Sequence, residues 1–351
     1  KDELKNQFYL PLDSVDLKGF VTKEHLTPEE ALKRNFEPMS PGTKWGAKWE
    51  YGWFKGDISL PEKAEGKKIV LSVGIGAESA VIVNGKASGM AIKEELRNRF
   101  DIRDQISLTE NANPGEEFNL LIEGYAGHGP RVTSTGPVPP ERESVPEPGS
   151  TQAVLGNSTF GIWSEDIYQL WLDVETLFQI RNNIDQESLR VAKIDEGLKE
   201  FTKIVDLESN YEKRLETVRK GRECLKPLLE CVNGSTVPTM YTFGHSHLDI
   251  AWLWTIAETE HKALRTFSTQ LSLMDRYSEY KFLQSQPYLY RMVEEKYPDL
   301  YDRIKKAVES GQFIPDGAMW VEADTNLSGG ESLIRQFLYG KRFFKEEFGV
   351  D

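Results

Sequence analysis

Two histidines and an aspartate alternate in the segment His245-Ser246-His247-Leu248-Asp249. Residues two apart in an extended chain point to the same side, so His247 and Asp249 can converge on one ion. Imidazole together with carboxylate is a common ligand pair for zinc and related divalent metals. The chain has only 5 histidines. Because two of them fall beside one aspartate, the segment favours metal or catalytic chemistry over the alternative of hydrogen-bonded core histidines.

A second pair of acidic residues, Glu322 and Asp324, occurs in the segment that begins at Trp320. A carboxylate there can ligate a metal, act as a nucleophile, or cap the following helix. The two acids are also two apart, so either one can face the same opening as His247 and Asp249.

Four further residues are candidates to line a pocket. Trp252 and Trp254 could stack on a sugar ring, with core packing as the alternative. Gln286 and Tyr288 follow the second predicted strand. They are candidate lining residues, with ordinary loop positions as the alternative.

The elements that would position these residues lie after residue 236. Helical periodicity and β-branched or aromatic runs alternate along this region. They predict strands over 237–244, 281–286 and 312–321, and helices over 258–277, 288–310 and 330–348. This alternation is typical of a parallel sheet built from βα units, which binds ligands at the carboxyl ends of its strands. A closed barrel of βα units needs about 250 residues. The region is therefore a small open sheet or the start of a barrel in a longer chain.

The residues before 237 predict two other domains. Residues 1–160 indicate an N-terminal β-sandwich with a Pro-rich loop at 125–160. Its clearest signal is the turn Asn84-Gly85 between two apolar runs, which predicts a hairpin. Thr27-Pro28 followed by two glutamates predicts a helix start. Residues 161–236 have helical spacing with a break near Ser209, which predicts a helical hairpin as a linker. The fold class is thus multidomain, α/β plus β, with residues 237–351 as the start of a truncated α/β barrel.

The composition excludes several classes of protein. The 351 residues include 43 basic and 56 acidic side chains, a net charge of −13. This balance argues against nucleic-acid binding, which depends on basic surfaces. No apolar run approaches the ~20 residues of a membrane span. The two cysteines, Cys224 and Cys231, lie roughly 10 Å apart along a helix, too far for a disulfide. Free thiols predict a cytoplasmic protein, and the chain could form a homo-oligomer.

With both motifs considered together, the sequence resembles the class II α-mannosidases of glycoside hydrolase family 38. The resemblance is carried by the segments His245–Trp252 and Trp320–Gln336 and by the βα texture between them. The upstream residues are similar to the N-terminal region of the cytosolic or vacuolar and bacterial branch of that family. Two positions depart from the commoner pattern, Ala323 and Ser328-Gly329, and both lie in loop backbone.

The resemblance implies a seven-stranded α/β barrel with a retaining active site and one divalent metal, usually zinc. It implies that His247 and Asp249 are metal ligands, and that Asp324 is both metal ligand and catalytic nucleophile. It also implies that Trp252 packs under the sugar. The implied substrate is a mannose-containing oligosaccharide. The family's fourth metal ligand and general acid/base lie further along the chain than Asp351, so we expect an N-terminal fragment that is inactive alone.

Two alternatives stay open. A metal-dependent amidohydrolase also uses a His-x-His pair at the end of a first barrel strand, and there the metal activates a water. That activity requires His245 on the metal, whereas the mannosidase does not. In a non-enzymatic alternative, the β-sandwich is a glycan-binding or assembly module.

Overall fold

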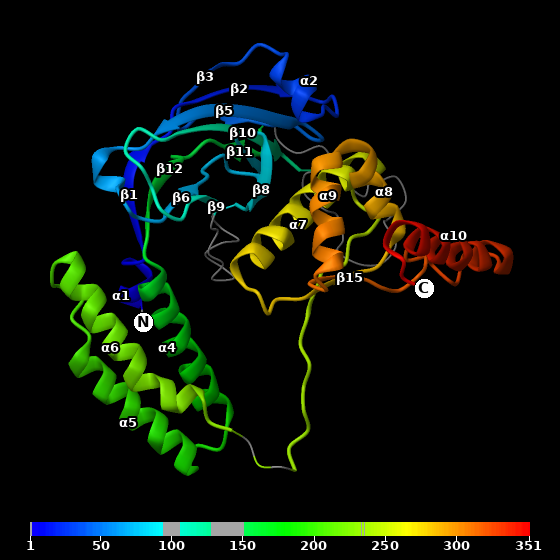
Figure 1. The fold of residues 1–351 in the computed structure, drawn as a ribbon. Helices are drawn as coiled ribbons and strands as arrows, with labels where there is room; N and C mark the ends of the chain where they lie inside the picture. Colours follow the sequence, from blue (N-terminus) through cyan, green and yellow to red (C-terminus); the bar gives the residue numbers. More distant parts are fainter. Residues whose placement is uncertain (1, 94–105, 128–150, 233, 235) are drawn as a thin grey trace, which may run out of the picture.

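The computed structural model describes residues 2–93, 106–127, 151–232, 234 and 236–351. Its N-terminal part is a β-sandwich of two antiparallel sheets, shown at the top of Figure 1. The first sheet has the order β1 (Tyr9–Ser14), β12 (Thr159–Trp163), β6 (Ile69–Ser72) and β9 (Ile106–Thr109). The second has the order β3 (Glu37–Met39), β2 (Leu17–Thr22), β5 (Tyr51–Ser59), β10 (Glu117–Tyr125), β7 (Glu78–Val83) and β8 (Lys86–Ala91).

Small elements complete the β-sandwich. They are α1 (Asp2–Lys5), α2 (Pro28–Leu32), β4 (Lys44–Trp45), η1 (Glu62–Ala64) and β11 (Ala153–Val154). The Asn84-Gly85 hairpin is confirmed, because β7 pairs with β8 and both turn residues have positive φ, 50° and 79°. The helix start at Thr27 is also confirmed, with a complete capping box on α2. Part of the predicted Pro-rich loop, including Pro137, Pro139, Pro140, Pro146 and Pro148, lies outside the described residues.

The second sheet buries side chains on both of its faces. Alternate residues of its strands, such as Phe54, Val81 and Ile122, enter the core between the two sheets. The residues between them point to the opposite face, because side chains alternate along a strand. That outer face carries Tyr51 and Glu123, and helix α7 lies against its β7 and β8 edge.

Three helices follow the β-sandwich, where the sequence predicted a helical hairpin. They are α4 (Glu165–Asn183), α5 (Leu189–Ile204) and α6 (Tyr211–Leu229), and they pack together around Leu177, Ile194 and Val218. Figure 1 shows them below the β-sandwich. The predicted hairpin with its break near Ser209 is confirmed by α5 and α6, and the prediction missed that the run after residue 164 forms a helix of its own, α4. Cys224 and Cys231 are both free thiols.

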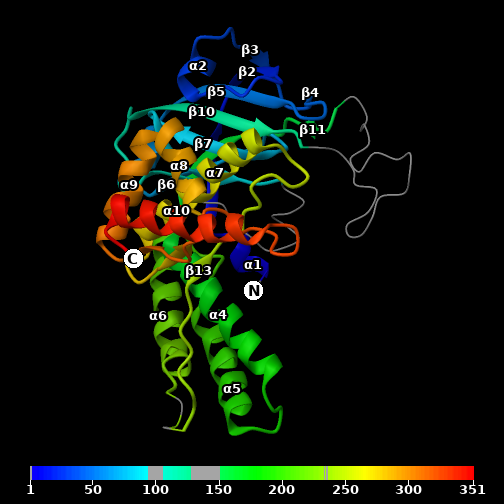
Figure 2. The ribbon, with the colours of Figure 1, turned by 90° about the vertical axis from the view of Figure 1, so that its right-hand side faces the viewer.

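The C-terminal part has three parallel strands in the order β13 (Gly244–His245), β14 (Phe282–Gln284) and β15 (Phe313–Pro315). Its helices are α7 (Ile256–Arg276), α8 (Pro287–Lys296), α9 (Pro298–Glu309) and α10 (Gly330–Phe348). The turned view of Figure 2 shows α10 in front of the other helices of this part. None of the helices in the described ranges carries an apolar stretch of the length that a bilayer requires.

Three predictions for this part were wrong. The strand predicted over 312–321 ends at Pro315, and residues 316–321 belong to the loop that follows it. The strand over 237–244 is formed only at Gly244, and residues 237–243 are exposed, since β13 has a partner strand on one side only. The helix over 288–310 is two helices, because Pro298 disfavours the helical conformation of Tyr297.

Candidate active site

The candidate site is formed by the loops that follow the three parallel strands. Residues 246–255 follow β13, Ser285 and Gln286 follow β14, and residues 316–329 follow β15. Parallel strands in register bring these loops to one edge of the sheet. The site residues named from the sequence therefore share this edge.

His247 lies between two carboxylates. Its Nε2 is 3.1 Å from Asp249 Oδ1, and its Nδ1 is 2.6 Å from Glu322 Oε2. If Nδ1 donates its proton to Glu322, the Nε2 lone pair faces the Asp249 carboxylate. Two electron-rich atoms at that separation repel unless a proton or another cation lies between them. The arrangement therefore suits a positive charge at Nε2.

The electrostatics of His247 agree with this reading. Partial burial alone would lower the pKa of His247, but the hydrogen bond that its ring donates to Asp249 and the charges of Glu322 and Asp249 outweigh it and raise that pKa. The three side chains are open to solvent, with exposures of 56%, 42% and 35% for His247, Asp249 and Glu322. A ligand from solution can reach them.

Gln286 joins the loops on either side of it. Its side chain is buried, its Nε2 donates to the Leu248 carbonyl at 2.9 Å, and its Oε1 accepts from the Glu322 amide at 3.1 Å. Ser285 Oγ donates to Glu322 Oε1 at 2.8 Å. The second strand end thus fixes Glu322 against His247. Gln286 has a φ of 59°, in the left-handed region, and the two hydrogen bonds help hold it there.

The other predicted site residues lie nearby with separate partners. Asp324 Oδ1 accepts from the Asn326 amide at 2.9 Å, as a turn-forming aspartate does. His245 Nδ1 is 3.0 Å from the Leu283 carbonyl oxygen. In the described part of the chain, no three His, Cys, Asp or Glu side chains group closely enough to hold a metal. The structure brings Glu322, and not Asp324, into contact with His247 and its neighbour Asp249.

The aromatic candidates fall into two classes. Trp252 is 53% exposed, and its ring lies edge-on to Trp254 with centroids 5.7 Å apart. Tyr288 instead stacks on Trp320, at 5.7 Å and 28°. Both of those rings pack against the C-terminal core, and Trp320, which was predicted to lie in a strand, follows the end of β15. Trp252 is therefore the aromatic residue that is accessible to a ligand.

The sequence analysis did not single out Ser285, or a set of buried charges on α7. Glu258, His261 and Arg265 are buried, and Glu123 of β10 faces them. The available signal was their spacing of three and four residues on a predicted helix, which places them on one face.

Two family models match the chain. The model described as the N-terminal domain of glycosyl hydrolases family 38 matches residues 237–351. The model described as the jelly roll domain of alpha-mannosidase matches residues 11–147.

Three curated relatives that match the chain are named alpha-mannosidases. Alpha-mannosidase G of Dictyostelium discoideum is 31% identical over 96% of this chain and 30% of its own length. Alpha-mannosidase 2C1 of Mus musculus is 28% identical over 96% of this chain and 31% of its own length. The alpha-mannosidase of Saccharomyces cerevisiae is 38% identical over 38% of this chain and 14% of its own length. The chain thus spans less than a third of these relatives, and it belongs to the alpha-mannosidases of glycosyl hydrolase family 38, as a part that carries the family's N-terminal domain.

Proposed function

We propose that the chain supplies the metal-binding half of a retaining α-mannosidase site that removes terminal mannose from an oligosaccharide. The observation that carries the proposal is the position of His247, with one ring nitrogen held by Glu322 and the other 3.1 Å from Asp249. Its family membership adds support, because the relatives named above are α-mannosidases.

The donor atoms of His247 and Asp249 suit a zinc ion. In a tetrahedral site, ligand atoms at about 2.0–2.2 Å from one zinc lie about 3.3–3.6 Å from each other. The 3.1 Å between Nε2 and Oδ1 is slightly shorter, so a small separation of the two side chains would admit the ion. Metal-bound histidines commonly donate their second ring nitrogen to a carboxylate, and Glu322 occupies that position on Nδ1. We therefore assign His247 and Asp249 as ligands, with Asp324 as the proposed third.

Each residue has a distinct role in the proposed reaction. A bound zinc would act as a Lewis acid and as a template for sugar hydroxyls. Asp324 attacks the anomeric carbon, and a retaining enzyme needs a second carboxyl about 5–5.5 Å away to protonate the leaving oxygen. We place that general acid and the fourth ligand in the part of the relatives' length that this chain does not span. Trp252 offers an exposed ring face to the apolar side of the sugar.

A metal-dependent amidohydrolase is the second candidate, on the observation that His245 Nδ1 contacts the Leu283 carbonyl. A backbone carbonyl on one ring nitrogen is a usual partner of a metal-binding histidine. His245→Gln separates the two functions. It leaves metal binding intact in the mannosidase and weakens it in the amidohydrolase.

The proposed function is tested by hydrolysis of an aryl α-mannoside with the full-length protein. Activity should disappear with a chelator, return with zinc, and fall roughly 10³-fold or more in Asp324→Asn, as when a catalytic group is removed. Asp316→Asn is the matched control, since Asp316 lies in the same loop and its side chain accepts a hydrogen bond from the adjacent Gly317 amide. Full activity in Asp324→Asn, or no turnover by folded, zinc-loaded protein, would contradict the proposal.

A further inference from the structure

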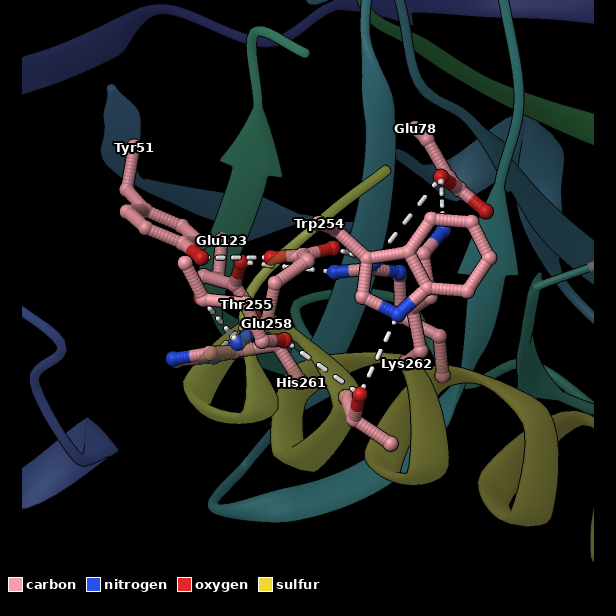
Figure 3. A network of polar contacts seen from close by, with 10 residues as sticks. Tyr51, Glu78, Glu123, Trp254, Thr255, Glu258, His261 and Lys262 are labelled. Carbon is pink, nitrogen blue, oxygen red and sulfur yellow. Dashed lines mark hydrogen bonds and ion pairs between the residues drawn. The ribbon is translucent and has the colours of Figure 1, made fainter. Parts of the chain in front are cut away.

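A buried network of charges joins the β-sandwich to α7 (Figure 3). Arg265 of α7 is 1% exposed; it contacts Glu258 and lies 3.5 Å from Glu123 Oε1 and 3.8 Å from Glu78 Oε2. His261 Nδ1 is 3.1 Å from Glu123 Oε2, and the Tyr51 hydroxyl donates to Glu258 at 2.5 Å. Since buried ions are strongly held only when each has a partner, this network fixes the first turns of α7 on the sheet.

The same turns of α7 hold the loop that bears Trp252. Thr259 is fully buried, and its hydroxyl accepts from the Ala251 amide and from Trp254 Nε1, both at 3.1 Å. Ala251 has a φ of 62°, a conformation that an alanine adopts only when neighbours impose it. Position 251 lies directly before Trp252, so this strained residue sets the direction in which Trp252 leaves the loop.

A lysine of α7 that pairs with the β-sandwich contacts the second tryptophan of this loop. The Lys262 ammonium lies 4.7 Å from the centroid of the Trp254 ring, in a cation–π contact. Glu78 of β7 holds that ammonium at 3.2 Å. The lysine ammonium sits on a flexible four-carbon chain, so without Glu78 it would lie over the Trp254 ring for less of the time. Figure 3 shows Trp254 beside Lys262, with Glu78 on the far side of the ammonium.

We infer that Glu78 of the β-sandwich is a positioning residue of the active site, acting through Lys262 and Trp254 on Trp252. The inference rests on the proposed function, in which Trp252 contacts the sugar. The β-sandwich thereby contributes to substrate binding, although none of its described residues contacts His247, Asp249 or Glu322 through a hydrogen bond or ion pair.

The test replaces Glu78 by glutamine in the full-length protein. Loss of one cation–π contact should raise KM for an aryl α-mannoside roughly two- to tenfold. The kcat should stay unchanged, because Trp252 binds ground state and transition state alike. Lys262→Met should give the same increase, and the double variant should add nothing further, as expected of residues in one chain of contacts. Glu212→Gln is the matched control, since Glu212 of α6 pairs with Lys67 of the β-sandwich at 3.3 Å away from this loop.

A second readout does not require catalysis. The protein is labelled with 5-fluorotryptophan, and the ¹⁹F signals of Trp252 and Trp254 are assigned from Trp→Phe variants. Glu78→Gln and Lys262→Met should shift both signals, whereas Glu212→Gln should shift neither. Unmoved signals, or an unchanged KM in an active enzyme, would overturn the inference. If the wild-type protein hydrolyses no α-mannoside, the proposed function fails and the ¹⁹F comparison still decides the role of Glu78.

Discussion

Replacing Arg265 by methionine should open the interface between α7 and the β-sandwich. Methionine keeps much of the side-chain volume but removes the cation that lies against Glu123 and Glu258, whose side chains are at most 1% exposed. Removing one partner of a buried ion pair costs about 3–5 kcal/mol, because the remaining charge stays desolvated. At about 1.36 kcal/mol per factor of ten, this corresponds to a ~10²·²- to ~10³·⁷-fold increase in local opening.

Hydrogen exchange measured by mass spectrometry on peptides from residues 256–276 reports this opening directly. The control is Arg219→Met, which removes the same residue type from a pair with Asp166 at 2.8 Å, where the arginine side chain is 65% exposed. An exposed pair contributes no more than about 1 kcal/mol, so the control should change exchange on its own helix less than about fivefold.

The pH dependence of the variant adds a second check. Burial raises the pKa of Glu258, and the charge of Arg265 opposes that rise. Without Arg265 the pKa of Glu258 rises further, so the carboxyl is protonated at a higher pH and the defect shrinks as the pH falls. An increase in exchange below tenfold at pH 7 would refute the reasoning. It would mean that the desolvation cost of the network equals its Coulomb gain.

Three further predictions follow from single contacts. Burial would lower the pKa of His261, but the surrounding carboxylates outweigh it and raise that pKa. The stabilisation by the imidazolium is therefore complete below about pH 6.5 and lost as the pH rises through the raised value; His261→Gln should abolish this dependence of α7 exchange. Gly340→Ala should reduce mannosidase activity, because its Cβ would lie 1.7 Å from the Ala318 carbonyl oxygen, while Gly330→Ala meets nothing within 4 Å and should not. Gln286→Ala should weaken zinc binding about tenfold or more, measured by chelator competition, because the two loops of the site lose their common support.

Local chemistry made some elements predictable from the sequence. The Asn84-Gly85 turn requires two left-handed residues, and few other dipeptides supply them. The helix over 330–348 has the predicted bounds, because Gly349 ends it in the left-handed conformation. The proximity of His247 and Asp249 was likewise predictable, because the two residues are only two positions apart in the sequence.

Contacts between distant segments were not predictable in the same way. The strand predicted over 237–244 has strong β propensity at Val237, but a strand also needs neighbours, and propensity carries no information about them. Glu322 was named only as one of two acids that could face the same opening as His247 and Asp249. Its contact with His247 depends on Ser285 and Gln286, which come from a third segment.

The charged face of α7 shows why contacts between distant segments cannot be predicted from local sequence. Charges spaced three and four residues apart usually mark a helix face in solvent, and Glu258, His261 and Arg265 have this spacing although all three are buried. The sequence signal that distinguishes the two cases lies 135 residues away from Glu258 in the chain, at Glu123, a carboxylate in an otherwise apolar strand. Each charge would be costly to bury alone, and both can be buried only because they are paired with each other. A buried charge in a strand therefore requires a partner, and the helix turns that supply it also carry Thr259, which accepts hydrogen bonds from the loop that bears Trp252.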